Sequence, residues 1–275
     1  MVTLMDPSGN TRVVVERTGA TIASIQTGGT ELLWRSPWAG EEWDGRYPAQ
    51  DSNAEFHARY PGGWHTLVPN AGDAFDVDGV AHPFHGEACW RPWQIVDADE
   101  ASCTLRIVLR TSPLTVERRV EARADGVVVT QEVTCYGADD VSFTWVEHPT
   151  FGPALVAPGT TVTVGGRQLD LEIPGPEATH SAMTVVDAGT ARITAPGGGL
   201  TAELTFDTGV FPLVQVWQEH RAQRGFPWWG VVDALAVEPS AAAYDARSEG
   251  DPLGPLTLAP GERLSATLQL RVETR

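Results

Sequence analysis

The feature that most constrains this chain is the recurrence of short β-type segments along nearly its whole length. Segments such as RVVVERTGATIASI, CTLRIVLRTS, GVVVTQEVTCY and RLSATLQLRV are rich in β-branched residues, and several alternate apolar with polar side chains. Turn clusters such as DPSGN, TGGT, GADD and LAPGE separate them. No long amphipathic helix stands out. Strands at this spacing predict an all-β sandwich or barrel rather than an α/β fold.

The segment from Leu105 to Val146 predicts a meander of antiparallel strands. Val127, Val129 and Val133 alternate with their neighbours there, which indicates one buried face and one solvated face. With 275 residues the chain has a length common among one-domain β-sandwiches, and it shows neither a linker nor an internal repeat. We therefore expect a single domain over residues 1–275.

Two segments break the regular pattern, residues 34–75 and 217–230. Both are rich in tryptophan, proline, glycine and charge. Long irregular segments on a β scaffold often carry function, and their aromatic content argues against disorder. We expect Trp64 and Trp217 to stack against a sugar ring, although aromatic residues also commonly serve as core and rim positions.

Composition excludes several classes of function. The chain has a formal net charge of -17, with 36 acidic residues against 19 basic ones, and all 19 are arginine. Without lysine it can form neither a Schiff base nor a P-loop. The negative charge disfavours nucleic acids and anionic membranes as partners.

The three cysteines and the first residues of the sequence bear on the cellular compartment in which we expect the protein. Cys89, Cys103 and Cys135 form no C-x-x-C pair, which argues against a zinc ribbon or a thioredoxin-like site. So sparse a set favours reduced thiols. The first residues show no signal-peptide pattern, and no apolar run is long enough to span a membrane. We expect a cytoplasmic protein.

Three short motifs place titratable side chains where chemistry could occur. In His82-Pro83-Phe84-His85-Gly86, two histidines in an extended segment do not point to one face, so we predict no metal site. The glycine after His85 would allow a close approach of a ligand or another strand. A purely structural His85 is the alternative.

The other two motifs share one form, a titratable residue and then a proline after an apolar strand. His148-Pro149 follows VSFTWVE, and Glu238-Pro239 follows VVDALAV. We expect each proline to end its strand and leave the preceding side chain beside a cleft. A buried carboxylate there suits a general base. A solvent-facing glutamate and a structural histidine are the alternatives.

Taken together, the order and spacing of these motifs resemble the aldose 1-epimerases, which are galactose mutarotase-like proteins. The resemblance runs over nearly the whole chain. It rests on Gly62-Gly63-Trp64 leading to Pro69-Asn70, on His85-Gly86, on His148-Pro149-Thr150-Phe151-Gly152, on Glu238-Pro239, and on Leu258-Ala259-Pro260-Gly261-Glu262. It implies a large antiparallel β-supersandwich that needs no cofactor.

The resemblance also implies roles for particular residues. Glu238 would be the base that takes the anomeric proton, and His148 the acid that protonates the ring oxygen. His85 would hold the ring oxygen and hydroxyls. Asn70 and Arg59 would bind substrate beside Trp64 and Trp217, while a further substrate-binding aspartate of the family has no evident counterpart. The expected partner is a small sugar, and a homodimer is left open.

Other functions remain open from the sequence alone. They are a non-catalytic sugar-binding protein on the same fold and a carbohydrate-active lyase or hydrolase, although the latter usually carries a helical domain or paired carboxylates. The trio of His85, His148 and Glu238 favours an enzyme. The absence of lysine and the net charge favour a neutral sugar over a sugar phosphate. Clustered arginines could still bind phosphate; the candidates are Arg59, Arg221 and Arg224.

Overall fold

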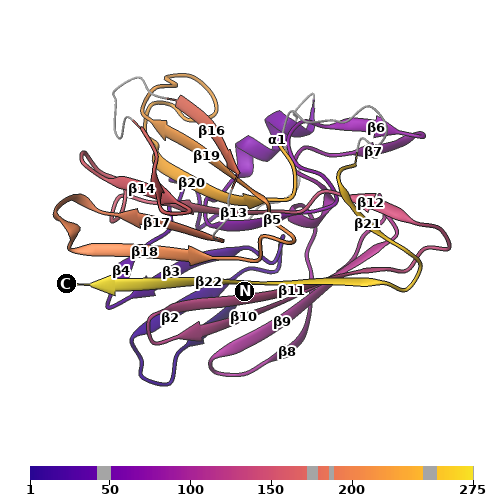
Figure 1. Cartoon of the computed structure of the whole chain (residues 1–275), viewed down its shortest axis with the longest axis horizontal. Coiled ribbons are helices and arrows are strands. Elements are labelled where there is room, and N and C mark those ends of the chain that lie inside the picture. The colour runs from indigo at the N-terminus through magenta and orange to yellow at the C-terminus, as the bar shows by residue number, and fades with distance from the viewer. Residues whose placement is uncertain (42–50, 172–178, 186–188, 244–252, 275) are drawn as a thin grey trace.

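The computed structural model describes residues 1–41, 51–171, 179–185, 189–243 and 253–274. Two large antiparallel sheets dominate these residues, with nine strands in each. They lie in stacked layers (Figure 1). This arrangement confirms the predicted all-β fold class, a large antiparallel sandwich.

Sheet I carries the outer face on which the candidate site lies. Its strand order is β1 (Val2–Met5), β2 (Thr11–Val15), β3 (Ile22–Thr27), β5 (Trp64–Leu67), β13 (Val146–Phe151), β20 (Asp233–Ser240), β19 (Leu213–His220) and β16 (Thr179–Val185), with β4 (Thr30–Glu31) paired to β3.

Sheet II closes the other side of the interior. Its order is β15 (Arg167–Gln168), β14 (Thr161–Val164), β17 (Thr190–Thr194), β18 (Leu200–Thr205), β22 (Arg263–Thr274), β11 (Gly126–Cys135), β10 (Leu114–Arg123), β9 (Ser102–Val108) and β8 (Gln94–Ala98). The expected meander is confirmed, because β9, β10 and β11 are consecutive antiparallel neighbours.

The remaining elements are short. The strands β6 (Phe75–Val77) and β7 (Val80–His82) form a hairpin. A second two-stranded sheet pairs β12 (Val141–Phe143) with β21 (Leu256–Leu258), which lies far along the chain. The helices are α1 (Ser52–Arg59) and the 3₁₀ turns η1 (Glu87–Cys89) and η2 (Pro196–Gly198). None of the helices among the described residues is long and apolar enough to cross a membrane.

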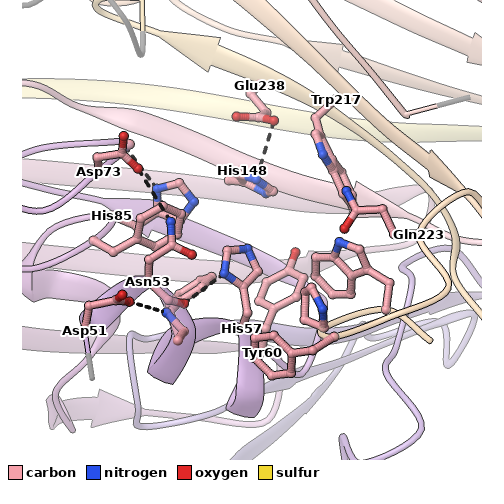
Figure 2. Close-up of a pocket in the computed structure, with 17 residues that line it drawn as sticks. Asp51, Asn53, His57, Tyr60, Asp73, His85, His148, Trp217, Gln223 and Glu238 are labelled. Carbon is pink, nitrogen blue, oxygen red and sulfur yellow. Dashed lines mark hydrogen bonds and ion pairs between the residues drawn. The ribbon is translucent and has the colours of Figure 1, made fainter. Parts of the chain in front are cut away.

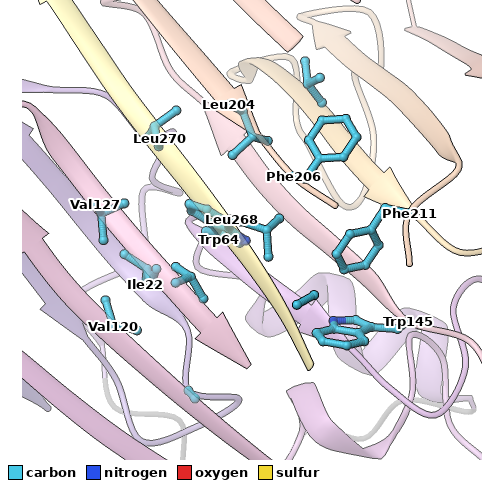
Figure 3. Close-up of a cluster of buried hydrophobic side chains, with 14 of the residues drawn as sticks. Ile22, Trp64, Val120, Val127, Trp145, Leu204, Phe206, Phe211, Leu268 and Leu270 are labelled. Atoms are coloured by element: carbon cyan, nitrogen blue, oxygen red, sulfur yellow. The ribbon is translucent and has the colours of Figure 1, made fainter. Parts of the chain in front are cut away.

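The main core fills the space between the two sheets. Side chains from sheet I, such as Ile22 and Trp64, meet Val120, Val127 and Leu268 from sheet II, and each of the five is fully buried (Figure 3). Alternation along the strands produces this layer, because every second side chain of a strand points to the same face. In β11 the predicted buried face is confirmed at Val127, Val129 and Val133.

A buried ion pair joins the two sheets inside this apolar layer. Arg118 of β10 contacts Glu147 of β13 at 2.8 Å, and neither side chain is exposed. Glu147 also accepts hydrogen bonds from the indole N–H groups of Trp64 (2.7 Å) and Trp145 (2.9 Å). Gln131 of β11 accepts from Arg118 and donates to Thr66 of β5. The two charges are therefore paired and hydrogen-bonded within a fully buried layer.

Helix α1 covers the outer face of sheet I, within a stretch expected to be irregular. Asp51 is its N-cap and accepts a hydrogen bond from the backbone N–H of Ala54 at 2.8 Å. The helix ends at Arg59, because Pro61 disfavours helical backbone in the residue before it, the C-cap Tyr60. Aromatic side chains of α1 and nearby loops form a second apolar cluster on this face; its members include Trp34, Phe56, Tyr60, Phe84 and Trp228.

The prolines after His148 and Glu238 do not end their strands, contrary to the prediction. β13 continues through Pro149 to Phe151, and β20 continues through Pro239 to Ser240. Each strand keeps a partner on its other side, where Pro149 faces Trp64 and Pro239 faces Val214. Instead, the prolines interrupt the pairing between β13 and β20. These strands pair at Val146 with Ser240, and the pairing then resumes only at Thr150 with Ala236. A residue without an N–H cannot close this part of the ladder.

Candidate functional site

A cavity of about 750 Å³ opens on the outer face of sheet I. Its volume lies within the range of sites for small organic ligands. Strands β13, β19 and β20 provide His148, Trp217 and Glu238, while helix α1 and three loops supply the facing wall (Figure 2). The full lining comprises Asp51, Asn53, Ala54, Phe56, His57, Tyr60, Gly72, Asp73, Phe84, His85, His148, Trp217, Gln223, Phe226, Pro227, Trp228 and Glu238.

His148 and Glu238 face each other across two neighbouring strands. The register of β13 and β20 places them directly opposite, in the interval where the ladder between the strands is open. Opposed residues of an antiparallel pair hold their Cβ atoms about 4.5–5.5 Å apart. The Nε2 atom of His148 lies 3.4 Å from Oε1 of Glu238, and the Glu238 side chain is fully buried. The sheet thus brings an imidazole and a carboxylate together at the cavity.

Two hydroxyl groups orient the His148 ring from behind. Its Nδ1 atom lies 3.2 Å from Oγ1 of Thr150, which in turn lies 2.7 Å from the hydroxyl of Tyr60. Burial raises the pKa of Tyr60, so this hydroxyl stays protonated. A hydroxyl both donates and accepts, so Thr150 can form a hydrogen bond with Nδ1 of His148 in either protonation state of the ring. The Nε2 atom is thereby kept toward Glu238.

His85 lines the cavity from the loop after β7, and its protonation state follows from its contacts. Burial, and then the neighbouring histidines His148, His57 and His65, lower the pKa of His85 well below its ordinary value. The ring is therefore neutral at pH 7. Because the backbone N–H of Gly72 donates to Nδ1 at 3.1 Å, the ring proton resides on Nε2. His85 is a neutral hydrogen-bond donor at that atom.

The loop that carries His85 is fixed by a close backbone contact. A Cβ atom at Gly86 would lie 2.6 Å from the carbonyl oxygens of Val68 and Asn70, and its φ of +80° also favours glycine. A ligand or a strand was expected to approach here; the backbone that approaches is the segment after β5, at Val68 and Asn70. Asn70 was expected to bind substrate, but it lies outside the cavity lining and donates to the carbonyl of Pro83 at 2.9 Å. Its observed contact supports the loop before His85.

Two further expected substrate contacts are corrected by the structure. Trp64 is fully buried in the main core, because the alternation of β5 points Trp64 and Thr66 inward and His65 and Leu67 outward. No face of Trp64 is left for a sugar. The guanidinium of Arg59 lies 4.0 Å from the ring centre of Trp90 and does not line the cavity.

Trp217 does line the cavity, and its ring lies 5.8 Å from that of Trp228. Several lining residues were not singled out from the sequence, notably His57, Tyr60, Asp51 and Asp73. The one local signal was the Asp51 N-cap, which starts α1 and so places Tyr60 and His57. No group of three or more histidine, cysteine or acidic residues in the described part of the chain could hold a metal ion.

We expect the stability of the protein to fall as the pH is lowered from 6.5 toward 4.5. Burial lowers the pKa of His65 to about 3, and it also lowers the pKa values of His85 and His57. Below pH 6.5 the unfolded chain binds protons that these histidines do not bind in the folded chain, so the free energy of unfolding falls. His65 alone lowers it by about 1.4 kcal/mol per pH unit over this window, and His85 and His57 act in the same direction. Urea denaturation at several pH values measures this slope. Constant or rising stability over that window would contradict it.

Comparison with known proteins identifies the fold. No family model matches the sequence, and no curated protein matches it. A Synechocystis sp. PCC 6803 protein of solved structure is similar over 100% of this chain and 96% of its own, with a TM-score of 0.77 at 18% identity. A provisionally named aldose 1-epimerase from Escherichia coli K12 is similar over 99% and 98%, with a TM-score of 0.73 at 21% identity.

A third solved structure, a galactose mutarotase-like protein from Lactobacillus casei ATCC 334, is similar over 99% of this chain and 100% of its own. Its TM-score is 0.72 at 17% identity. At such identities the likeness establishes the fold, and the expected galactose mutarotase-like β-sandwich is confirmed.

Proposed function

We propose that the protein is an aldose 1-epimerase, which interconverts the α and β anomers of a small aldose. The observation that carries the proposal is the pair formed by His148 and Glu238, 3.4 Å apart at the wall of a cavity of sugar size. A base and an acid at adjacent oxygens are what anomer exchange requires. The names of the structural neighbours from Escherichia coli K12 and Lactobacillus casei support the same activity.

In the proposed reaction Glu238 removes the proton of the anomeric hydroxyl, and His148 delivers a proton to the ring oxygen. The bond between the anomeric carbon and the ring oxygen breaks, which leaves an open-chain aldehyde and a free hydroxyl. Rotation about the first carbon–carbon bond exposes the other face of the aldehyde. On closure the hydroxyl attacks this face, His148 takes its proton back, and Glu238 returns its own to the new anomeric oxygen.

The other expected site residues fit around this step. The neutral His85, with its proton on Nε2, is suited to donate to the ring oxygen or a hydroxyl without repelling a protonated His148. The exposed part of Trp217 is suited to pack on the C–H face of a pyranose. The proposal needs no cofactor, and it places the enzyme in the cytoplasm, which the three buried and unpaired cysteines favour.

We expect neutral aldoses to be the substrates in preference to their phosphates. None of the described residues that line the cavity is an arginine, whereas Asp51 and Asp73 are acidic. Arg221 is paired with Asp233, and Arg59 stacks on Trp90. Among the described lining residues a dianion would therefore meet acidic side chains and no arginine.

The test is polarimetry on freshly dissolved sugars, with glucose, galactose and other aldoses set beside glucose 6-phosphate. We expect the enzyme to accelerate mutarotation of at least one neutral aldose. Glucose 6-phosphate should be processed poorly. Acceleration confined to the phosphate would reverse the proposed substrate class while keeping the reaction.

A further inference from the structure

A third histidine of the cavity, His57, has its ring proton on the other nitrogen from His85. On helix α1 its Nδ1 atom lies 2.8 Å from the backbone carbonyl of Asn53, one turn earlier. A carbonyl can only accept, so Nδ1 carries the proton of this ring. Burial lowers the pKa of His57, which keeps the ring neutral. Its Nε2 atom therefore presents a lone pair.

Packing holds the His57 ring in place at the cavity wall. The ring meets Trp228 edge to face at 5.4 Å and lies 5.2 Å from the ring of Phe84. Both of these residues also line the cavity. Hydrogen bonds among the described residues use Nδ1 and leave Nε2 to what enters the cavity. A hydrogen-bond acceptor held in place within an aromatic wall favours ligands that bring a donor, such as a hydroxyl group, to that point.

The position of His57 indicates which part of a sugar it would meet. Glu238 and His148 stand on sheet I, and the ring neighbours of His148 are Tyr60 and His85. His57 stands on α1, the element that covers this face (Figure 2). The rings of Phe56, Phe84 and Trp228 surround it. In a pyranose, the bond opposite the one between the ring oxygen and C1 joins C3 to C4. If the bond between the ring oxygen and C1 lies at His148 and Glu238, then C3 and C4 of the sugar face α1.

We infer that Nε2 of His57 accepts a hydrogen bond from the 3- or 4-hydroxyl of the sugar and so selects the substrate. The inference rests on the proposed function, because it assumes a sugar in this cavity. His57 would act as a specificity residue and take no part in proton transfer. The two rings divide recognition between them, with His85 donating and His57 accepting.

The test compares wild type with His57→Phe, which keeps the ring shape and removes the acceptor. Binding of glucose or galactose, whichever binds more tightly, is measured by calorimetry beside the 2-, 3- and 4-deoxy derivatives. We expect wild type to bind either the 3-deoxy or the 4-deoxy sugar about 2- to 10-fold more weakly than the parent. In His57→Phe that ratio should fall to about one, while discrimination at position 2 is unchanged.

Kinetics and a control separate this inference from its premise. We expect His57→Phe to raise KM and leave kcat within about threefold of wild type, as loss of uniform binding predicts. His82→Phe makes the same substitution outside the cavity and should behave as wild type. Unchanged discrimination among all the deoxy sugars in a folded His57→Phe would overturn the inference alone. Failure of wild type to bind any aldose, neutral or phosphorylated, would overturn the proposed function, and the inference with it.

Discussion

Replacement of Glu238 by glutamine is expected to lower kcat for mutarotation by about 10²–10⁴-fold. The glutamine has nearly the same shape as the fully buried glutamate, so the cavity wall should be preserved, but the amide cannot accept the anomeric proton. The rate falls because the base that opens the ring is absent. His148→Asn should lower kcat by a similar factor through loss of the acid.

The design of this experiment separates catalysis from binding. Kd for the sugar, followed by tryptophan fluorescence, should stay within a few-fold of wild type in Glu238→Gln. The matched control is Glu203→Gln, a partly exposed position on β18 of sheet II. A folded Glu238→Gln protein with wild-type kcat would remove Glu238 from the mechanism. The protein would then be better described as a sugar-binding module.

The second large effect concerns stability rather than activity. Glu147→Gln should lower the free energy of unfolding by about 3–5 kcal/mol, because it leaves the charge of Arg118 buried without its counter-ion. That is a large share of the total stability of an ordinary domain. Urea denaturation gives the change directly.

A double substitution tests the cause of that loss. Arg118→Met with Glu147→Gln removes both charges. The single carbonyl oxygen of the glutamine can accept from only one of the two indoles, Trp64 or Trp145, and this loss is common to the single and the double variant. We expect the double variant to be more stable than Glu147→Gln alone. If the double variant is less stable than the single one, the ion pair is not what the single substitution disrupts. Glu147 directly precedes His148 in β13, so this network also supports the strand that holds the proposed acid.

The buried and exposed faces of the long strands can be predicted from the sequence, whereas the cavity cannot. Alternation in β11 correctly indicated which face is buried, because a strand has a period of two. The same rule explains the error at Trp64. Its neighbour His65 is one of the outward residues of β5. Which residues of a short strand in an irregular stretch point outward could not be fixed from the sequence.

The cavity depends on contacts between segments far apart in the chain. Residues 51–60, the loop before His85 and the segment around Trp228 come together only in the folded protein. Helix α1 is eight residues long, too short for a periodic signal, so His57 and Tyr60 went unnoticed. The prolines after His148 and Glu238 do not end their strands as predicted; they open the ladder between two continuous strands beside the cavity.

The most direct test of the proposed function is anomer exchange at equilibrium, measured by NMR magnetisation transfer on a neutral aldose. If the protein is an aldose 1-epimerase, the wild type should increase the rate at which magnetisation passes between the α and β anomeric signals. Glu238→Gln at the same concentration should leave that rate near the uncatalysed value. Exchange that wild type does not accelerate for any aldose tested would contradict the proposed function.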